Sequence, residues 1–133
     1  MPIVGPEFYM GFPTLGVSEK YLLMIADGSK TVEGRKKKAE RDLWLNKGVV
    51  FWNDAAGPSD FHGRRKVLVQ ITAICCYPDV KSFVRTEWYK ALLPDAASEM
   101  EAIQLYERLY PAADVILAGG ICGLAVKVVN DNF

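Results

Sequence analysis

The feature that most limits the possible folds is the strongest strand signal of the chain, a mostly apolar run at residues 66–76 that reads KVLVQITAICC. Val, Ile and Thr are β-branched and fit a pleated, half-buried surface, so this run predicts a buried strand. Shorter signals of the same kind predict strands at residues 8–12, 49–52 and 121–129. Residues 53–63 are rich in Asn, Asp, Gly, Pro and Ser, which predicts a loop. The chain is therefore expected to build a sheet.

Helical patterns alternate with these strands. Apolar residues recur at helical spacing after Ser18, a good N-cap residue, and Gly28 provides a stop. Residues 80–92 predict a second helix, and Ser98 with Glu101 forms the Ser-x-x-Glu capping box that opens a third. Strands before, between and after a pair of adjacent helices predict an α+β fold with a mixed, curled sheet.

Length and composition narrow the class of protein. A chain of 133 residues fits one domain, spanning residues 1–133. Sixteen basic and sixteen acidic residues cancel, so binding of nucleic acid through bulk charge is not expected, although a local basic patch is compatible with these numbers. We see neither a secretory signal nor an apolar run of roughly 18–20 residues that could span a membrane, which predicts a cytoplasmic protein without a membrane partner.

The three cysteines are expected to stay reduced. Their number is odd, and Cys75 and Cys76 are sequence neighbours, a pattern that favours free intracellular thiols over a disulfide framework. Adjacent residues of a strand point to opposite faces, so these two do not form half of a zinc site. We therefore expect no metal and no cofactor.

The densest group of chemically active side chains lies in residues 28–35, GSKTVEGR. Residues 31–33 predict a short strand, in which Thr31, Glu33 and Arg35 project from one face, with Lys30 in the bend after the helix. The plain structural alternative is a turn that leads into a solvated strand edge.

GSKTVEGR resembles the Gly-x-Lys-x-x-Glu-x-Arg signature of ASCH domains, which are relatives of the PUA RNA-binding fold. The resemblance covers roughly residues 8–129. Its flanking pieces are residues 9–11, 19–25, 47–51, 67–77, 82–83, 93–94, 98–102 and 106–111. The resemblance implies a single domain with a PUA-like, curled mixed β-barrel and flanking helices. It also implies a cleft between GSKTVEGR and the helix at residues 98–110.

The resemblance implies several activities, because fold alone does not decide function. The family is commonly proposed to bind RNA, while some members are amidohydrolases acting on N4-acylated cytidines and others are ribonucleases. The Lys and Glu of the amidohydrolase group match Lys30 and Glu101. The position of its Thr holds Glu33 here, as in the wider family, and the nearest hydroxyl is Thr31. In this alternative Lys30 is the base, Glu101 shuttles protons, and Thr31 or a water is the nucleophile. Glu101 has a structural alternative as the capping-box residue.

Binding of single-stranded RNA or a nucleotide-like ligand is the main expectation. Lys30 and Arg35 would contact phosphate or a polar base edge, and Glu33 would orient these cations or accept a hydrogen bond from the ligand. Further contacts are expected from the basic run and from one aromatic residue, namely Lys36, Lys37, Lys38, Arg41, Arg64, Arg65 and Tyr77. Trp44 and Trp52 could stack on bases, or belong to the core. A protein-interaction module, with an exposed apolar patch, is the remaining alternative.

Overall fold

The computed structural model describes residues 6–54 and 61–133, and residues 55–60 of the expected loop lie outside them. The described strands form one mixed sheet in the order β1-β2-β4-β5-β6-β3. Their bounds are β1 (Phe8–Tyr9), β2 (Phe12–Val17), β3 (Val32–Lys36), β4 (Gly48–Asn53), β5 (Lys66–Tyr77) and β6 (Ile121–Asn130). β2 runs parallel to β4, and the other pairs are antiparallel.

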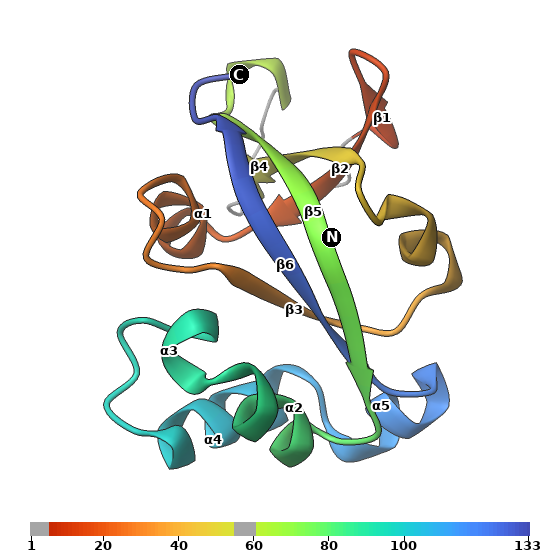
Figure 1. The fold of residues 1–133 in the computed structure, drawn as a ribbon, viewed down its shortest axis with the longest axis vertical. Helices are drawn as coiled ribbons and strands as arrows, with labels where there is room; N and C mark the ends of the chain where they lie inside the picture. The colour runs from red at the N-terminus through yellow and green to blue at the C-terminus, as the bar shows by residue number, and fades with distance from the viewer. Residues whose placement is uncertain (1–5, 55–60) are drawn as a thin grey trace.

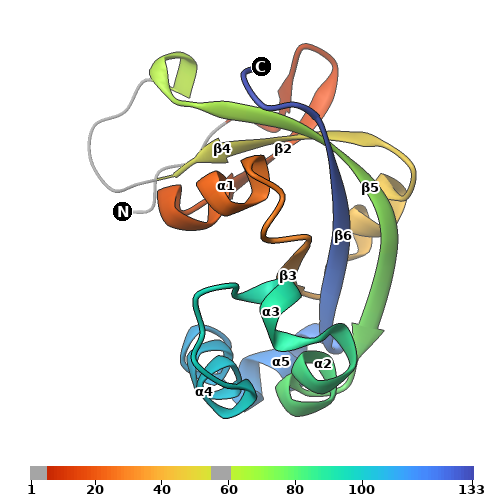
Figure 2. The ribbon, with the colours of Figure 1, turned by 60° about the vertical axis from the view of Figure 1, so that its left-hand side comes forward.

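Helices lie at two places along this sheet. Their bounds are α1 (Glu19–Ala26), α2 (Val80–Glu87), α3 (Tyr89–Leu92), α4 (Glu99–Leu109) and α5 (Ala112–Ala118), with 3₁₀ turns η1 (Ala39–Trp44) and η2 (Phe61–Gly63). β5 and β6 form a long ribbon, with α2, α4 and α5 gathered at one end and α1 beside β2 and β4 near the other (Figures 1 and 2). No helix in the described part of the chain is long and apolar enough to cross a membrane.

Two hydrophobic cores correspond to these two groups of helices. The first packs α1 against β2, β4 and β5, with Leu22, Ile25 and Phe51 at its centre. The second packs α2 and α4 against the far end of the sheet, around Phe83 and Ile103. All five of these side chains are almost fully buried. The first core includes Leu22 and Ile25 from the apolar residues that recur at helical spacing after Ser18.

The expected α+β class is confirmed, although the curled sheet does not close into a barrel. β1 and β3 are its edges, so β2 and β3 are not paired along their length. We call the gap between β2 and β3 the seam. One side-chain contact bridges it, in which Arg35 Nη2 on β3 donates a hydrogen bond to the Gly16 carbonyl on β2. The seam is the feature of the fold that positions the site described below.

Side chains cap two of the described helices, at Asp79 and at the predicted Ser98, whereas the predicted cap Ser18 makes no side-chain bond, and the helix expected at 80–92 is interrupted. Asp79 Oδ1 accepts from the Ser82 N–H at 2.8 Å, and Ser98 Oγ accepts from the Glu101 N–H at 3.1 Å. Trp88 has a φ of 73°, which a right-handed helix cannot accommodate, so α2 ends and the short α3 begins there. The sequence pattern also missed α5.

The expectation of three reduced thiols is wrong in this structure. Cys76 on β5 and Cys122 on β6 are bonded to each other, and Cys75 is exposed and free. Cys76 and Cys122 are register partners in the antiparallel ribbon, with Cα atoms 4.0 Å apart. Residues separated by 46 positions meet here only because β5 and β6 pair, which no local pattern reveals.

Candidate functional site

The octapeptide at residues 28–35 turns inward directly after α1. Gly28 has a φ of 86°, which lets the backbone leave the helix, and Lys30 follows with only 1% of its surface exposed. Lys30 Nζ donates hydrogen bonds to the carbonyls of Val32, at 2.8 Å, and Leu92. It also lies 5.4 Å from the centroid of the Tyr21 ring. The ammonium group is therefore surrounded by partners from its own chain.

Glu33 links Lys30 to Arg35 in a buried row of alternating charges. Its Oε1 lies 3.4 Å from Lys30 Nζ and accepts from the Gly34 N–H, and its Oε2 accepts from Arg35 Nη2 at 3.2 Å. Burial alone would raise the pKa of Glu33, but the charges of Lys30 and Arg35 outweigh it and hold that pKa below its usual range. Burial lowers the pKa of Lys30, although Glu33 opposes the shift. The carboxylate thus holds both cations in place.

Helix α4 packs on the octapeptide from the side of the second core. A Cβ at Gly34 would lie 2.7 Å from Phe83 and 2.9 Å from Tyr106, so only glycine fits beneath these rings. The Tyr110 hydroxyl donates to the Gly34 carbonyl at 3.4 Å. The expected cleft between GSKTVEGR and this helix is wrong at that point, because aromatic side chains fill the space.

A larger cavity lies at the seam, on the side facing β1, β2 and η1. Its volume is about 930 Å³, and we call it the seam pocket. It is lined by Pro6, Glu7, Phe8, Gly11, Phe12, Pro13, Thr14, Leu15, Gly16, Arg35, Lys38, Glu40, Arg41, Leu43, Trp44, Lys47, Gly48, Trp52 and Asp54. Arg35 belongs to the octapeptide, whereas none of these described residues comes from α4. The octapeptide therefore contributes its last side chain to the pocket.

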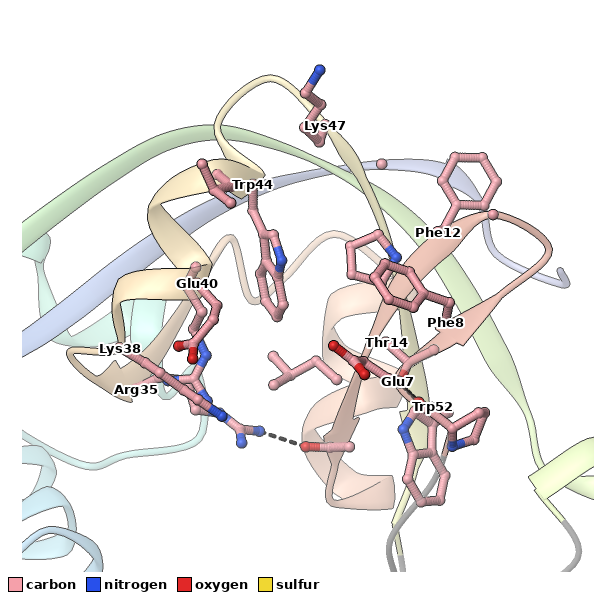
Figure 3. Close-up of a pocket in the computed structure, with 18 of the residues that line it drawn as sticks. Glu7, Phe8, Phe12, Thr14, Arg35, Lys38, Glu40, Trp44, Lys47 and Trp52 are labelled. Carbon is pink, nitrogen blue, oxygen red and sulfur yellow. Dashed lines mark hydrogen bonds between the residues drawn. The ribbon is translucent and has the colours of Figure 1, made fainter.

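Two chemically different walls face each other across the seam pocket. Figure 3 shows Arg35, Lys38 and Trp44 on the wall formed by β3 and η1. Glu7 and Trp52 belong to the opposite wall, formed by the β1–β2 segment and β4. The first wall thus combines an aromatic ring with cations, and the second combines an aromatic ring with a carboxylate.

Arg41 adds a second guanidinium to the η1 wall. Its Nη1 donates to the Lys36 carbonyl at 2.8 Å, and its guanidinium carbon lies 5.9 Å from the Trp44 ring centroid. Burial and the nearby charge of Arg35 both lower the pKa of Arg41. The guanidinium groups of Arg35 and Arg41 repel each other on this wall. An anionic group placed between them would stabilise both.

Solved structures share this arrangement of strands and helices, whereas no protein-family model and no curated protein matches the sequence. The hypothetical protein PH0355 superposes with a TM-score of 0.68 at 20% identity, covering 87% of this chain and 97% of that one. Protein PF0455 from Pyrococcus furiosus superposes with a TM-score of 0.64 at 21% sequence identity, covering 87% of this chain and 96% of that one. ASCH from Zymomonas mobilis superposes with a TM-score of 0.56 at 14% sequence identity, covering 86% of this chain and 65% of that one.

The chain has an ASCH-like fold. At these identities the likeness concerns the fold. It agrees with the resemblance of GSKTVEGR to the ASCH signature, and in this structure the signature's Lys, Glu and Arg form the buried charge row. In this ASCH-like fold the signature therefore holds the start of β3 in place and presents its Arg to the seam.

The ASCH-like fold brings five of the residues considered from sequence to the seam pocket. Arg35, Lys38 and Arg41 line it, as do Trp44 and Trp52. Trp52 is 3% exposed and packs at the pocket edge, so its expected place in the core is compatible with a place in the wall. Trp44 is half-buried.

Other expected contact residues lie outside the pocket. Lys36 and Lys37 are exposed next to it but do not line it. Arg65 Nη2 donates to the Asp131 carbonyl at 3.0 Å, and Tyr77 donates to Glu87 Oε2 at 2.8 Å. Like these two, Arg64 is absent from the pocket lining. A rim composed of all these residues therefore does not form.

The three residues of the hydrolase alternative are not joined to one another. Lys30 is buried, whereas Thr31 and Glu101 are exposed. The Glu101 backbone N–H donates to Ser98 Oγ, so Ser98 caps α4. In the described residues, no hydrogen bond or ion pair links Glu101 to Lys30. Hydrolysis of acylated cytidines, and ribonuclease activity, stay predictions.

Sequence reasoning missed the wall formed by residues 6–16. The single strand expected at residues 8–12 is wrong, because Met10 and Gly11 have positive φ values and turn the chain between β1 and the antiparallel β2. This hairpin supplies Phe8 and Phe12 to the pocket. Glu7, which precedes it, carried no pattern of its own. The aromatic density of this segment was the one signal that could have pointed to the site.

Proposed function

We propose that this ASCH-like chain binds single-stranded RNA or a nucleotide-like ligand in the seam pocket. The observation that carries the proposal is the meeting of cations and aromatic rings around one cavity, with Arg35, Lys38 and Arg41 beside Trp44. Cations that fix phosphates, next to rings that stack on bases, are the combination that single-strand binding uses. The volume of about 930 Å³ falls in the range of roughly 300–1,000 Å³ typical of ligand pockets.

The η1 wall supplies the phosphate contacts of this proposal. Arg35 is held by Glu33 and by the Gly16 carbonyl, so its guanidinium is fixed before a ligand arrives. Arg41 is anchored by the Lys36 carbonyl, and Lys38 has an exposed side chain. A planar guanidinium donates two parallel hydrogen bonds to phosphate, while the Lys ammonium acts as a point charge.

The aromatic residues supply the base contacts. Trp44 is half-buried and Phe8 is 59% exposed, so both rings keep accessible surface at the pocket. Every base has a π-face, and stacking of one base on an aromatic side chain contributes about 1–3 kcal/mol. Because this contribution hardly depends on the base, stacking explains binding without explaining sequence preference.

The test is a fluorescence-anisotropy titration with a short labelled single-stranded RNA at two salt concentrations. Wild type is compared with Arg41→Gln and with the matched control Arg85→Gln, which lies on α2 and is absent from the pocket lining. We expect affinity that falls as salt rises, weaker binding by the first variant, and wild-type binding by the second. Absence of binding at low salt would overturn the proposal, as would equal weakening by both substitutions.

A further inference from the structure

The two walls of the seam pocket differ in the charge that is available to a ligand. Arg35 and Lys38 lie on the β3–η1 wall, and Glu7 lies on the opposite wall (Figure 3). Arg41 belongs to η1 and also lines the pocket. Among the described residues, the Glu7 carboxylate makes no hydrogen bond or ion pair. Its backbone carbonyl accepts from the Thr14 N–H at 3.2 Å, which fixes the segment that carries it. A free acceptor therefore projects from an anchored backbone.

The other two carboxylates of the pocket are placed differently. Asp54 lies close enough to Arg35 to raise the pKa of that guanidinium. Glu40 belongs to η1, on the same wall as the cations. Glu7 thus faces the cations from across the cavity, on a wall that also carries Trp52.

An ionised carboxylate only accepts hydrogen bonds, so it selects for adjacent donors. On the Watson–Crick edge of guanine the ring N–H and the exocyclic amino group lie side by side, and one carboxylate accepts from both. Adenine and cytosine offer a single amino group there, and uracil offers a single ring N–H. A stacked base presents this edge sideways, toward the walls of its pocket.

We infer that the seam pocket reads guanine, with the guanine edge on the Glu7 carboxylate and a neighbouring phosphate on the Arg35–Arg41 wall. The inference rests on the proposed function and adds a base preference to it. The separation of charge orients the ligand, because the anionic backbone is attracted to one wall and the donor edge to the other. Because a bidentate contact discriminates between bases, we expect about tenfold tighter binding of a guanine-containing RNA, which corresponds to about 1.4 kcal/mol.

The experiment measures anisotropy with labelled hexauridine and with hexamers that carry one central G, inosine, A or C. The base of inosine is guanine without its exocyclic amino group. Inosine therefore removes one of the two donors and leaves the rest of the base unchanged. Wild type is compared with Glu7→Gln and with Glu40→Gln, which removes the same charge from the opposite wall of the same pocket. We expect G to bind best and inosine less well, with the preference for G lost in Glu7→Gln and kept in Glu40→Gln.

The outcomes separate this inference from the proposed function. Equal affinity for all five hexamers would overturn the guanine preference and leave RNA binding in place. A preference for G that survives Glu7→Gln would overturn the assignment to Glu7. If none of the hexamers binds at low salt, the proposed function itself fails. Circular dichroism of each variant confirms that the comparison is made between folded proteins.

Discussion

Lys30 Nζ and Glu33 Oε1 lie 3.4 Å apart with 1% and 9% of their side-chain surfaces exposed, and the second oxygen of Glu33 contacts Arg35. A motif of charged residues, expected to meet a ligand, is thus mostly turned toward the protein interior. Arg35 is the member that reaches the seam pocket. This buried row of charges connects the end of α1 to the wall of the seam pocket. The shape of the pocket therefore depends on the row staying intact.

Removal of the Lys30 side chain is expected to destabilise the fold. Lys30→Ala leaves the buried Glu33 paired with Arg35 alone and two buried carbonyls without a donor, which costs about 3–5 kcal/mol. Urea denaturation measures the loss. Lys36→Ala, an exposed residue of β3, serves as control and should stay within about 0.5 kcal/mol of wild type. A stable Lys30→Ala protein that merely loses ligand binding would favour a direct functional role for Lys30.

The lowered pKa of Glu33 predicts that the folded protein loses stability in acid. Its folded-state pKa is depressed, so its contribution is complete above the ordinary glutamate pKa of about 4.3 and disappears as pH falls through the folded-state value. The free energy of unfolding, measured in urea over a pH series, should fall on acidification more steeply in wild type than in Glu33→Gln. Asp27 and Asp79, whose pKa values are also lowered through their contacts with Ser29 and Ser82, contribute to both proteins and cancel. Parallel profiles would contradict the buried pairing.

The substitution Gly34→Ala is expected to destabilise the protein, because there is no room for a side chain at this position. Its Cβ would approach the Phe83 ring to 2.7 Å inside the second core, and overpacking of this kind costs about 1–3 kcal/mol. Gly63→Ala is the matched control, because no atom of the described residues lies within 4 Å of the Cβ that it would add. Thermal unfolding of both variants tests the difference. Equal melting temperatures would show that α4 does not pack tightly on the octapeptide.

The Cys76–Cys122 bond predicts one free thiol per chain. Cys75 alone should react with a thiol reagent in denaturant without a reductant, and all three cysteines should react after reduction. The bond closes a loop over a sequence separation of 46 residues, for which the chain-entropy model gives a stabilisation of about 4 kcal/mol. Reduction should therefore lower the urea midpoint. Three reactive thiols in the unreduced protein would show that the bond does not form in solution.

Lys38 and Lys37 are neighbours with different expected effects on RNA binding. Lys38 lines the seam pocket, whereas Lys37 is exposed outside its lining. If Lys38 contacts a phosphate, Lys38→Ala should weaken binding of every RNA and reduce the slope of log affinity against log salt by about one. Lys37→Ala should leave that slope unchanged. Equal slopes for the two variants would indicate a diffuse basic surface in place of a defined contact.

Sequence reasoning identified most of the elements because their signals are local. The β-branched run of β5, the caps at Asp79 and Ser98 and the stop at Gly28 each depend on residues within a few positions. It missed the break at Trp88, since a positive φ at a tryptophan is imposed by packing and not by its own preference. It did not identify the seam pocket, because spacing along a strand does not reveal which side of the strand is filled.

By itself, the sequence determined the α+β class, the positions of the principal strands and helices, and the membership of Lys30, Glu33 and Arg35 in one cluster. Tertiary structure alone decided that Lys30 is buried, that Cys76 meets Cys122, and that the segment carrying Glu7 faces η1 across the seam. The physical reason is that periodicity and capping depend on neighbouring residues, whereas burial and pocket shape depend on which distant surfaces pack together.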